Sequence, residues 1–208
     1  MARRALKPGE LPTSETLVAR AAVWFGERGF DGGSLRELGA ELGVTAPTLL
    51  HHVGSKQKLY ARVLAHVADD LAAAYAARAS GDVEHEDEDH VAALVDAYLG
   101  WSRQNEAYAR LLMRELLDNR ERAANGKYWP LAGIVQTVTA QVRRVRGGST
   151  VDAAMVVFQA IGAIAYFAAA EPTLRKILDL GPKTDLAGPF GVAMHRALRA
   201  GLDKRRTA

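Results

Sequence analysis

Cysteine is absent from this sequence of 208 residues, so the chain has neither a disulfide framework nor a thiolate for catalysis or metal binding. Proline is sparse, with seven residues, and 49% of all residues are hydrophobic. This composition favours an all-helical protein with enough apolar residues to bury a core, either as one domain or as two small ones.

A signal-peptide pattern and long apolar runs are also missing. The N-terminal residues lack the basic-then-apolar layout of a secretory signal. The apolar run at 160–170 is shorter than the roughly 20 residues that cross a bilayer. We therefore expect a soluble protein of the cytoplasm.

The chain has no large excess of charge of either sign, but its small excess is unevenly placed. The net charge is +3, and residues 1–66 contain nine Lys and Arg against six Asp and Glu. The remaining residues contain equal numbers of each sign. Because a phosphate-binding surface requires positive charge, this distribution favours a nucleic-acid contact in the first third of the chain, although the surplus is weak evidence alone.

Residues 34–56 show the pattern of a helix-turn-helix. Ser34 and Glu37 have the spacing of a capping box, which predicts a helix that starts directly after Ser34. Leu35, Leu38 and Leu42 then form one apolar stripe at helical spacing.

A second short helix is predicted directly after the first. Gly43 can adopt the left-handed conformation that ends a helix, and Thr45 is a good N-cap for the next one. Pro47 stands in the first turn of that helix, where a missing amide costs little. Gly39 has no side chain that would hold the two helices apart. The expected unit is a helix, a tight turn and a second helix that starts at Ala46.

This stretch resembles the DNA-binding domain of the TetR family of bacterial transcriptional regulators. The resemblance is specific over about the first third of the chain and only architectural beyond it. Leu50 stands where the family commonly has Tyr, so it lacks the hydroxyl for a phosphate contact, and Val53 replaces a common Phe but still fills core. The matching residues are Phe30, Ser34, Leu35, Arg36, Glu37, Leu38, Leu42, Gly43, Val44, Thr48, Leu49, His51, His52, Gly54, Ser55, Lys56 and Leu59.

The second helix of a helix-turn-helix enters the major groove with its N-terminal residues toward the base edges. This arrangement places Ala46, Pro47 and Thr48 at the bases, where only Thr48 offers a hydroxyl. Arg36 is the strongest base reader available, because its guanidinium can bridge guanine O6 and N7; the alternative is an arginine that meets only phosphate or solvent. Direct readout is poor, so DNA shape and apolar contacts are expected to carry much of the specificity.

The family resemblance implies contacts with the DNA backbone as well. His51 and His52 match positions that touch phosphates, although one of the pair would alternatively pack against the first helix. Lys56 resembles the phosphate-binding lysine of the family. Thr45 serves mainly as a cap whose helix N-terminus faces phosphate. Leu50 completes the predicted DNA-binding set.

The remaining sequence predicts a chain in four parts. Residues 1–12 form a basic arm, which either follows DNA or is a solvated tail, and residues 13–66 form the DNA-binding domain. A long helix over 55–79 connects this domain to a helical ligand-binding and dimerisation domain over 67–203. Residues 204–208 form a basic tail.

The last two long helices are the predicted dimer interface. The more apolar one covers 151–170 and ends before Pro172; a short helix around 173–179 and a last helix over 185–202 follow. Small residues on the apolar helix would let another helix approach closely. In the resembled family, two such helices from each subunit form a four-helix bundle; the alternative is that they pack within one subunit.

Aromatic and polar residues at helix-facing positions predict a small-molecule pocket. Such residues also fit an ordinary core, and it is the family resemblance that favours a pocket. No basic cluster accompanies them, which favours an apolar or weakly polar effector. The candidates are Tyr98, Trp101, Tyr108, Met113, Trp129, Phe158, Gln159 and Tyr166.

The predicted function is a ligand-responsive regulator, most simply a homodimeric repressor that binds a palindromic operator in double-stranded DNA and is released by a small molecule. The alternatives are an activator and a helical interaction protein that has this fold without specific DNA reading. We expect no enzyme and no cofactor, because no catalytic arrangement and no Gly-rich phosphate loop are present. The acidic run at 82–90 contains no closed ligand set, so no metal site is predicted.

Overall fold

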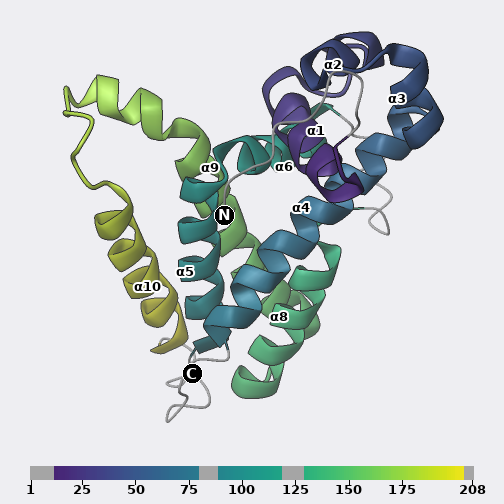
Figure 1. Cartoon of the computed structure of the whole chain (residues 1–208). Helices are drawn as coiled ribbons and strands as arrows, with labels where there is room; N and C mark the ends of the chain where they lie inside the picture. Colours follow the sequence, from purple (N-terminus) through teal and green to yellow (C-terminus); the bar gives the residue numbers. More distant parts are fainter. Residues whose placement is uncertain (1–11, 80–88, 119–128, 204–208) are drawn as a thin grey trace. The chain divides into compact units, whose positions relative to one another are not determined.

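The computed structural model describes residues 12–79, 89–118 and 129–203, and these residues form α-helices without any strand. The predicted all-α fold class is confirmed. The basic tail, nearly all of the basic arm and most of the acidic run lie outside the described residues. The helices, labelled as in Figure 1, are α1 (Ser14–Arg28), α2 (Leu35–Leu42), α3 (Ala46–Val53), α4 (Lys56–Ala79), α5 (Asp89–Gln104), α6 (Glu106–Asp118), α8 (Ala132–Arg146), α9 (Thr150–Ile177) and α10 (Ala187–Asp203).

The chain divides into two compact units. The first unit comprises the described residues of Met1–Asp69 and Ala107–Pro130, and the second comprises those of Asp70–Glu106 and Leu131–Ala208. Helix α4 contributes its first part to one unit and its last part to the other. The division within α4 falls near the boundary predicted at residue 66. Helix α6 belongs to the first unit, whereas the predicted domain over 67–203 placed it with the second part of the chain.

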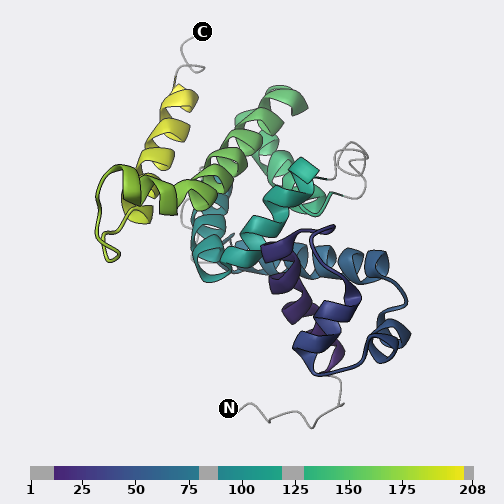
Figure 2. The ribbon, with the colours of Figure 1, turned by 90° about the horizontal axis from the view of Figure 1, so that it is seen from above.

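Helices α1, α2 and α3 lie together in both ribbon views (Figures 1 and 2). The Thr16 amide donates to Thr13 Oγ1 at 3.3 Å and thereby caps the start of α1, and Gly29 ends the helix with a φ of 76°. Trp24 and Phe25 are buried, with their rings edge to face and their centroids 5.0 Å apart. Helix α1 therefore supplies the aromatic centre of the first unit.

Helix α6 joins the first unit through close contacts with α1 and α4. A Cβ at Gly26 would overlap the carbonyl oxygen of Ala107, so glycine is required for this approach of α1 and α6. The buried Tyr60 hydroxyl of α4 donates to Glu115 Oε2 of α6 at 2.8 Å. Because a buried carboxyl group is costly without partners, this hydrogen bond helps to hold α6 against the first part of α4.

Helix α5 is central to the second unit, where it packs against α8, α9 and α10. Trp101 Nε1 donates to Asp70 Oδ2 at 2.6 Å, which links α5 to the last part of α4. His195 Nε2 of α10 and Asp96 Oδ1 of α5 lie 2.8 Å apart. Polar pairs thus fix two neighbouring helices onto α5, while its apolar residues fill the core.

The prediction that Pro172 would end the apolar helix is wrong. Helix α9 continues through the proline to Ile177, and the short helix expected around 173–179 is the end of α9. Proline removes one hydrogen-bond donor from a helix interior. Glu171 Oε1 and Arg175 Nη2, which flank the proline one turn apart, pair at 2.6 Å and stabilise this turn.

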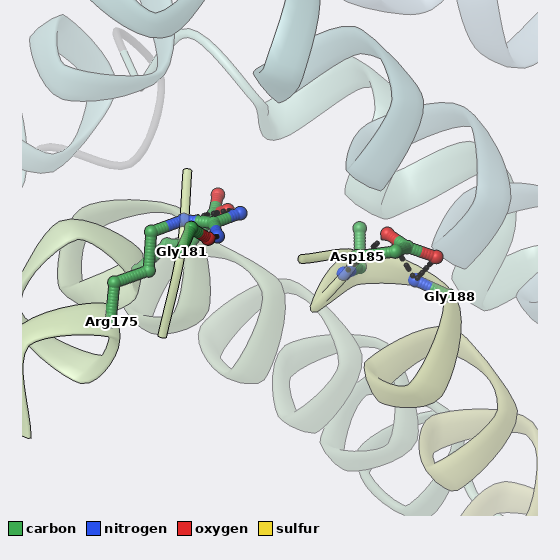
Figure 3. Close-up of polar contacts among 6 residues, drawn as sticks. Arg175, Gly181, Asp185 and Gly188 are labelled. Atoms are coloured by element: carbon green, nitrogen blue, oxygen red, sulfur yellow. Dashed lines mark hydrogen bonds and ion pairs between the residues drawn. The ribbon is translucent and has the colours of Figure 1, made fainter. Parts of the chain in front are cut away.

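The connection from α9 to α10 is ordered by side chains that bind backbone groups (Figure 3). Arg175 Nη1 donates to the carbonyl oxygen of Gly181 at 3.0 Å. Asp185 Oδ1 accepts hydrogen bonds from the amides of Ala187 and Gly188 at 3.1 and 3.2 Å, which caps the start of α10. The same arginine therefore supports the proline turn and the loop that follows it.

Helix α9 is, among the described helices, the one whose length and composition would allow it to cross a membrane. Its most apolar 18-residue window has a mean hydropathy of 1.9, and 39% of that window is buried within the chain. This apolar helix is longer than expected because the proline does not end it. A core helix of a soluble protein passes the same test, so the finding is weak evidence for a membrane span.

Two neighbouring leucines in α3 test the orientation of this helix. Leu49 is fully buried and Leu50 is 48% exposed. We expect Leu49→Ala to lower the free energy of unfolding by about 2–5 kcal/mol. Leu50→Ala, as the matched control, should change it by less than about 0.5 kcal/mol. Chemical denaturation followed by circular dichroism measures both, and equal losses would contradict the described orientation.

Candidate DNA-binding site

Local hydrogen bonds and glycines shape the pair of helices α2 and α3. The Ser34 amide donates to Glu37 Oε2 at 2.7 Å, and the Glu37 amide donates to Ser34 Oγ at 3.3 Å, which completes the capping box. Gly43 ends α2 in the left-handed conformation with a φ of 74°. A Cβ at Gly39 would lie 3.0 Å from the Val44 carbonyl oxygen, so glycine lets the turn approach α2 closely. The two helices are therefore joined by a tight, well-defined turn.

Helix α3 turns Leu49 and Val53 into the core and leaves its other side accessible. The residues that remain exposed or half-buried are Ala46, Pro47, Thr48, Leu50, His51 and His52. We call this set the α3 surface. The α3 surface contains all the residues of α3 that were predicted from the sequence to contact DNA, and none of them is buried.

The first turn of α3 is held by two threonines. The Thr48 amide donates to Thr45 Oγ1 at 3.3 Å, and the two hydroxyl oxygens lie 2.8 Å apart. Because a hydroxyl has one donor and two acceptor sites, Thr48 keeps part of its hydrogen-bonding capacity for another partner. Thr45 acts as the predicted cap.

Both histidines at the end of α3 are exposed. The rings of His51 and His52 lie edge to face with centroids 5.7 Å apart. The alternative in which one ring is buried against α1 therefore does not fit this arrangement. Each imidazole is accessible to an external acceptor such as phosphate.

The arginines near α2 differ in whether they form hydrogen bonds or ion pairs within the chain. Arg28 Nη2 pairs with Glu41 Oε1 at 2.7 Å, and Arg20 donates to the Glu41 carbonyl oxygen at 3.1 Å. Arg36, on the first turn of α2, is exposed and forms no hydrogen bond or ion pair with any residue that the structure describes. Its guanidinium is therefore the arginine group in this region that remains available for a ligand.

Two lysines lie at the start of α4, close in sequence to the end of α3. Lys56 Nζ lies 4.7 Å from the centroid of the Phe30 ring, a cation–π contact that orients the ammonium group. The amide of Lys58 donates to Ser55 Oγ at 3.1 Å, and the Lys58 side chain is exposed. Lys58 is not among the residues predicted to contact DNA, although it lies two residues after Lys56 within the same capped turn.

The predicted effector-binding residues do not form one set within one unit. Tyr98 and Trp101 are buried in the second unit, with ring centroids 5.9 Å apart. Tyr108, Met113 and Trp129 are half-buried residues of the first unit. The sequence pattern placed all of them on inward-facing helix positions, but it could not indicate that α6 returns to the DNA-binding unit.

The three candidates on α9 differ more strongly from the expectation. Phe158 is 46% exposed and Tyr166 is 72% exposed, and Gln159 is also exposed. The opposite side of α9 packs against α5 and α8, so these three side chains face outward from the second unit. They do not line an enclosed pocket within the described part of this chain.

Metal-site geometry is not present in the segments that the structure describes, where no group of three or more His, Asp or Glu side chains could hold an ion. Most of the acidic run at 82–90 lies outside these segments.

The geometry defines the class of protein first. Helices α2 and α3 are joined by a tight turn and pack beside α1, and α3 has an accessible surface with basic side chains near it. This arrangement is a helix-turn-helix DNA-binding domain in an all-helical chain. Residues 17–63 match the family model of the bacterial regulatory proteins of the tetR family. This match confirms the predicted resemblance of the first third of the chain to the TetR family.

Solved structures share the fold over nearly the whole chain. A TetR-like transcriptional regulator from Rhodococcus sp. RHA1 is 18% identical, covers 93% of this chain and 99% of its own, and has a TM-score of 0.67. The fatty acid degradation regulator FadR from Bacillus halodurans is 12% identical, with coverages of 91% and 96% and a TM-score of 0.65. The TetR family transcriptional regulator PfmR from Thermus thermophilus is 17% identical, with coverages of 88% and 96% and a TM-score of 0.62.

These identities establish a shared fold and nothing finer. A search of curated proteins gives no match.

The capping box of α2 predicts a pH-dependent contribution to stability. The hydrogen bond from the Ser34 amide, followed by that from the Ser34 hydroxyl, lowers the pKa of Glu37 below its ordinary value of 4.5. A lowered folded-state pKa means that the ionised carboxylate stabilises the fold above the unfolded pKa, and this contribution is lost as pH falls through the folded pKa. Glu37→Gln should therefore lower Tm at neutral pH, and the deficit should shrink in acid.

Thermal unfolding followed by circular dichroism across this pH window measures the effect. Asp31→Asn, which changes another exposed carboxylate, is the control. A deficit of the same size at neutral and acid pH would contradict the role of the ionised carboxylate.

Proposed function

We propose that this protein is a homodimeric transcriptional repressor of the cytoplasm that binds a palindromic operator and is released by a small apolar or weakly polar molecule. The observation that carries the proposal is the accessible α3 surface with the unengaged Arg36 beside it and Lys56 at the next helix start. The TetR-family DNA-binding domain supports the transcriptional role.

The division of labour on DNA follows from side-chain chemistry. Ala46, Pro47 and Thr48, at the N-terminus of α3, meet base edges, and Arg36 bridges a guanine from the first turn of α2. Lys56 and the two histidines contact phosphates, which position the domain without reading sequence. The exposed apolar side chain of Leu50 contributes contact area only. Because few of these groups are polar, much of the specificity comes from DNA shape.

A second copy of the chain is proposed to cover the outward side of α9. Val151, Met155, Phe158, Gly162 and Tyr166 recur every three or four residues, so they share one face of the helix. The four large side chains among them are between 46% and 72% exposed. An apolar face of this kind on a soluble protein marks an interaction surface.

The small residues of α9 support both arrangements that the sequence left open. Ala153, Ala160 and Ala165 are buried within the chain, where they allow close packing of its own helices. Gly162 is exposed, and a Cβ built there would meet nothing within 4 Å. The dimer proposal therefore rests on the exposed face and not on the alanines.

The proposed response to the effector acts through α4. This helix buries Leu59 and Val63 in the first unit and Leu71 and Tyr75 in the second. A molecule that binds the second unit and favours a different position of the last part of α4 would change the first part as well. Release of DNA then depends on the differential affinity of the effector for the two states.

Fluorescence anisotropy with DNA that flanks the protein's own gene, beside a scrambled duplex, tests DNA binding over a series of salt concentrations. We expect preference for the flanking DNA and a steep salt dependence. Arg36→Ala should cost about 1–3 kcal/mol of discrimination between the duplexes, because a bidentate base contact is lost. Lys56→Gln should weaken binding to both and reduce the slope of log K against log salt by about one.

Lys183→Gln, which changes an exposed lysine of the second unit, is the matched control and should alter neither quantity. If the affinity of the unmodified protein for DNA does not change with salt concentration, the DNA-binding proposal is contradicted.

Two glycines provide a matched test of the dimer interface. A Cβ at Gly162 of α9 or at Gly133 of α8 would meet nothing within 4 Å, so Glu fits at either position within a single chain. Gly162→Glu places a charge in the proposed interface and should raise the dimer dissociation constant at least about tenfold, whereas Gly133→Glu should not. Sedimentation velocity measures both. A dimer that is equally stable in both variants would place the interface elsewhere.

A further inference from the structure

The α3 surface has an apolar side and a polar side. Successive residues of an α-helix are about 100° apart around its axis, so Ala46, Pro47 and Leu50 lie on one side of α3. Thr48 and His52 lie on the other side. Residues three and four apart on a helix are neighbours, so Leu50 adjoins both Pro47 and Ala46. We call Ala46, Pro47 and Leu50 the apolar strip.

Leu50 supplies most of the exposed apolar area of this strip. Among the described residues of α1, α2 and α3, Val23 and Leu50 are the large hydrophobic side chains that are exposed, and Leu50 is 48% exposed. A single exposed leucine needs no explanation on a protein surface. Leu50 differs because it belongs to a strip on the helix that enters the major groove. When α3 occupies the groove, this side chain loses water and needs an apolar partner there.

The polar side chains of α3 leave little capacity for reading bases. The hydroxyl oxygens of Thr48 and Thr45 lie 2.8 Å apart, so part of the hydrogen-bonding capacity of Thr48 is used within the chain. His51 and His52 stand in the last turn of α3, whereas the N-terminal residues of a recognition helix meet the base edges. The apolar strip is therefore the larger part of what α3 offers to the bases.

Thymine is the base that presents a methyl group in the major groove. The other groups that distinguish the base pairs there are hydrogen-bond donors and acceptors. An apolar side chain that covers a donor or an acceptor leaves it unsatisfied, which is costly. Contact with a methyl group instead removes apolar surface of both partners from water. The chemistry of the apolar strip therefore favours thymine at the base pairs that it faces.

We propose that the apolar strip reads the C5-methyl group of thymine in the major groove, with Leu50 as the side chain that determines this specificity. This inference rests on the proposed DNA binding and names what the exposed area of Leu50 contacts. Leucine has no hydrogen-bonding group in its side chain, so it cannot serve a phosphate or a polar base edge.

Deoxyuridine tests the methyl group directly, because it differs from thymidine by this group alone. The full chain first selects its preferred duplexes from a random pool. Each thymine of the selected sequence is then replaced singly by uracil, and fluorescence anisotropy measures the affinities. We expect about a fourfold loss at one or more positions, as the burial of one methyl group predicts, and no loss at the others.

Cytosine and 5-methylcytosine at a sensitive position provide a second comparison. Both bases pair with guanine, so the polar groups in the groove are the same and the methyl group alone differs. The duplex with 5-methylcytosine should bind about fourfold more tightly than the one with cytosine. Equal affinities would show that the methyl group is not what the protein reads, and they would overturn the proposal.

Variants connect the methyl group to Leu50. Leu50→Ala should bring the thymine-to-uracil ratio of affinities close to one and leave the affinity for the uracil duplex unchanged, because the side chain and the methyl group act on each other. Leu50→Met, which keeps an apolar side chain of similar volume, should retain most of the ratio. His52→Ala, on the polar side of α3, is the control and should weaken binding to both duplexes equally.

Three results would overturn the proposal: a selected sequence without thymine, ratios of one at every thymine, and an unchanged ratio in Leu50→Ala. If the protein selects a sequence with salt-dependent affinity and uracil has no effect, this inference fails and the proposed function stands. If no sequence is enriched and binding does not depend on salt, both fail.

Discussion

Helix α4 has to fit two hydrophobic cores, and the rest of the structure depends on this constraint. Its first part buries Leu59 and Tyr60 in the DNA-binding unit, and its last part buries Leu71 and Tyr75 in the second unit. The hydrogen bond from Tyr60 to Glu115 and the one from Trp101 to Asp70 fasten the two parts to α6 and α5. One continuous helix therefore contributes buried side chains to both cores.

Helix α9 also has to bury apolar side chains on more than one side, because it is apolar on almost all sides. One side packs against α5 and α8, and the other retains Met155, Phe158 and Tyr166 at the surface. A helix that is hydrophobic all round is expected to be buried on both sides. Among the described residues of one chain, α9 keeps these side chains exposed, and the proposed second copy would complete its burial.

The second unit also distributes its hydrogen bonds unevenly. Most buried polar groups in folded proteins are paired, and Ser102 and Trp101 follow this rule. The Thr139 hydroxyl departs from it, because it forms no hydrogen bond within the described part of the chain.

The sequence by itself determined the features whose causes lie within a few residues. The capping box of Ser34 and Glu37, the left-handed Gly43 and the Thr45 cap define α2, the turn and α3, because each depends on a local hydrogen bond or a backbone conformation. The tertiary structure alone decided that α6 packs in the DNA-binding unit, that α9 continues through Pro172 and that Tyr166 faces outward. These outcomes depend on which faces meet across long stretches of chain, and helical periodicity identifies an apolar face without identifying the partner that covers it.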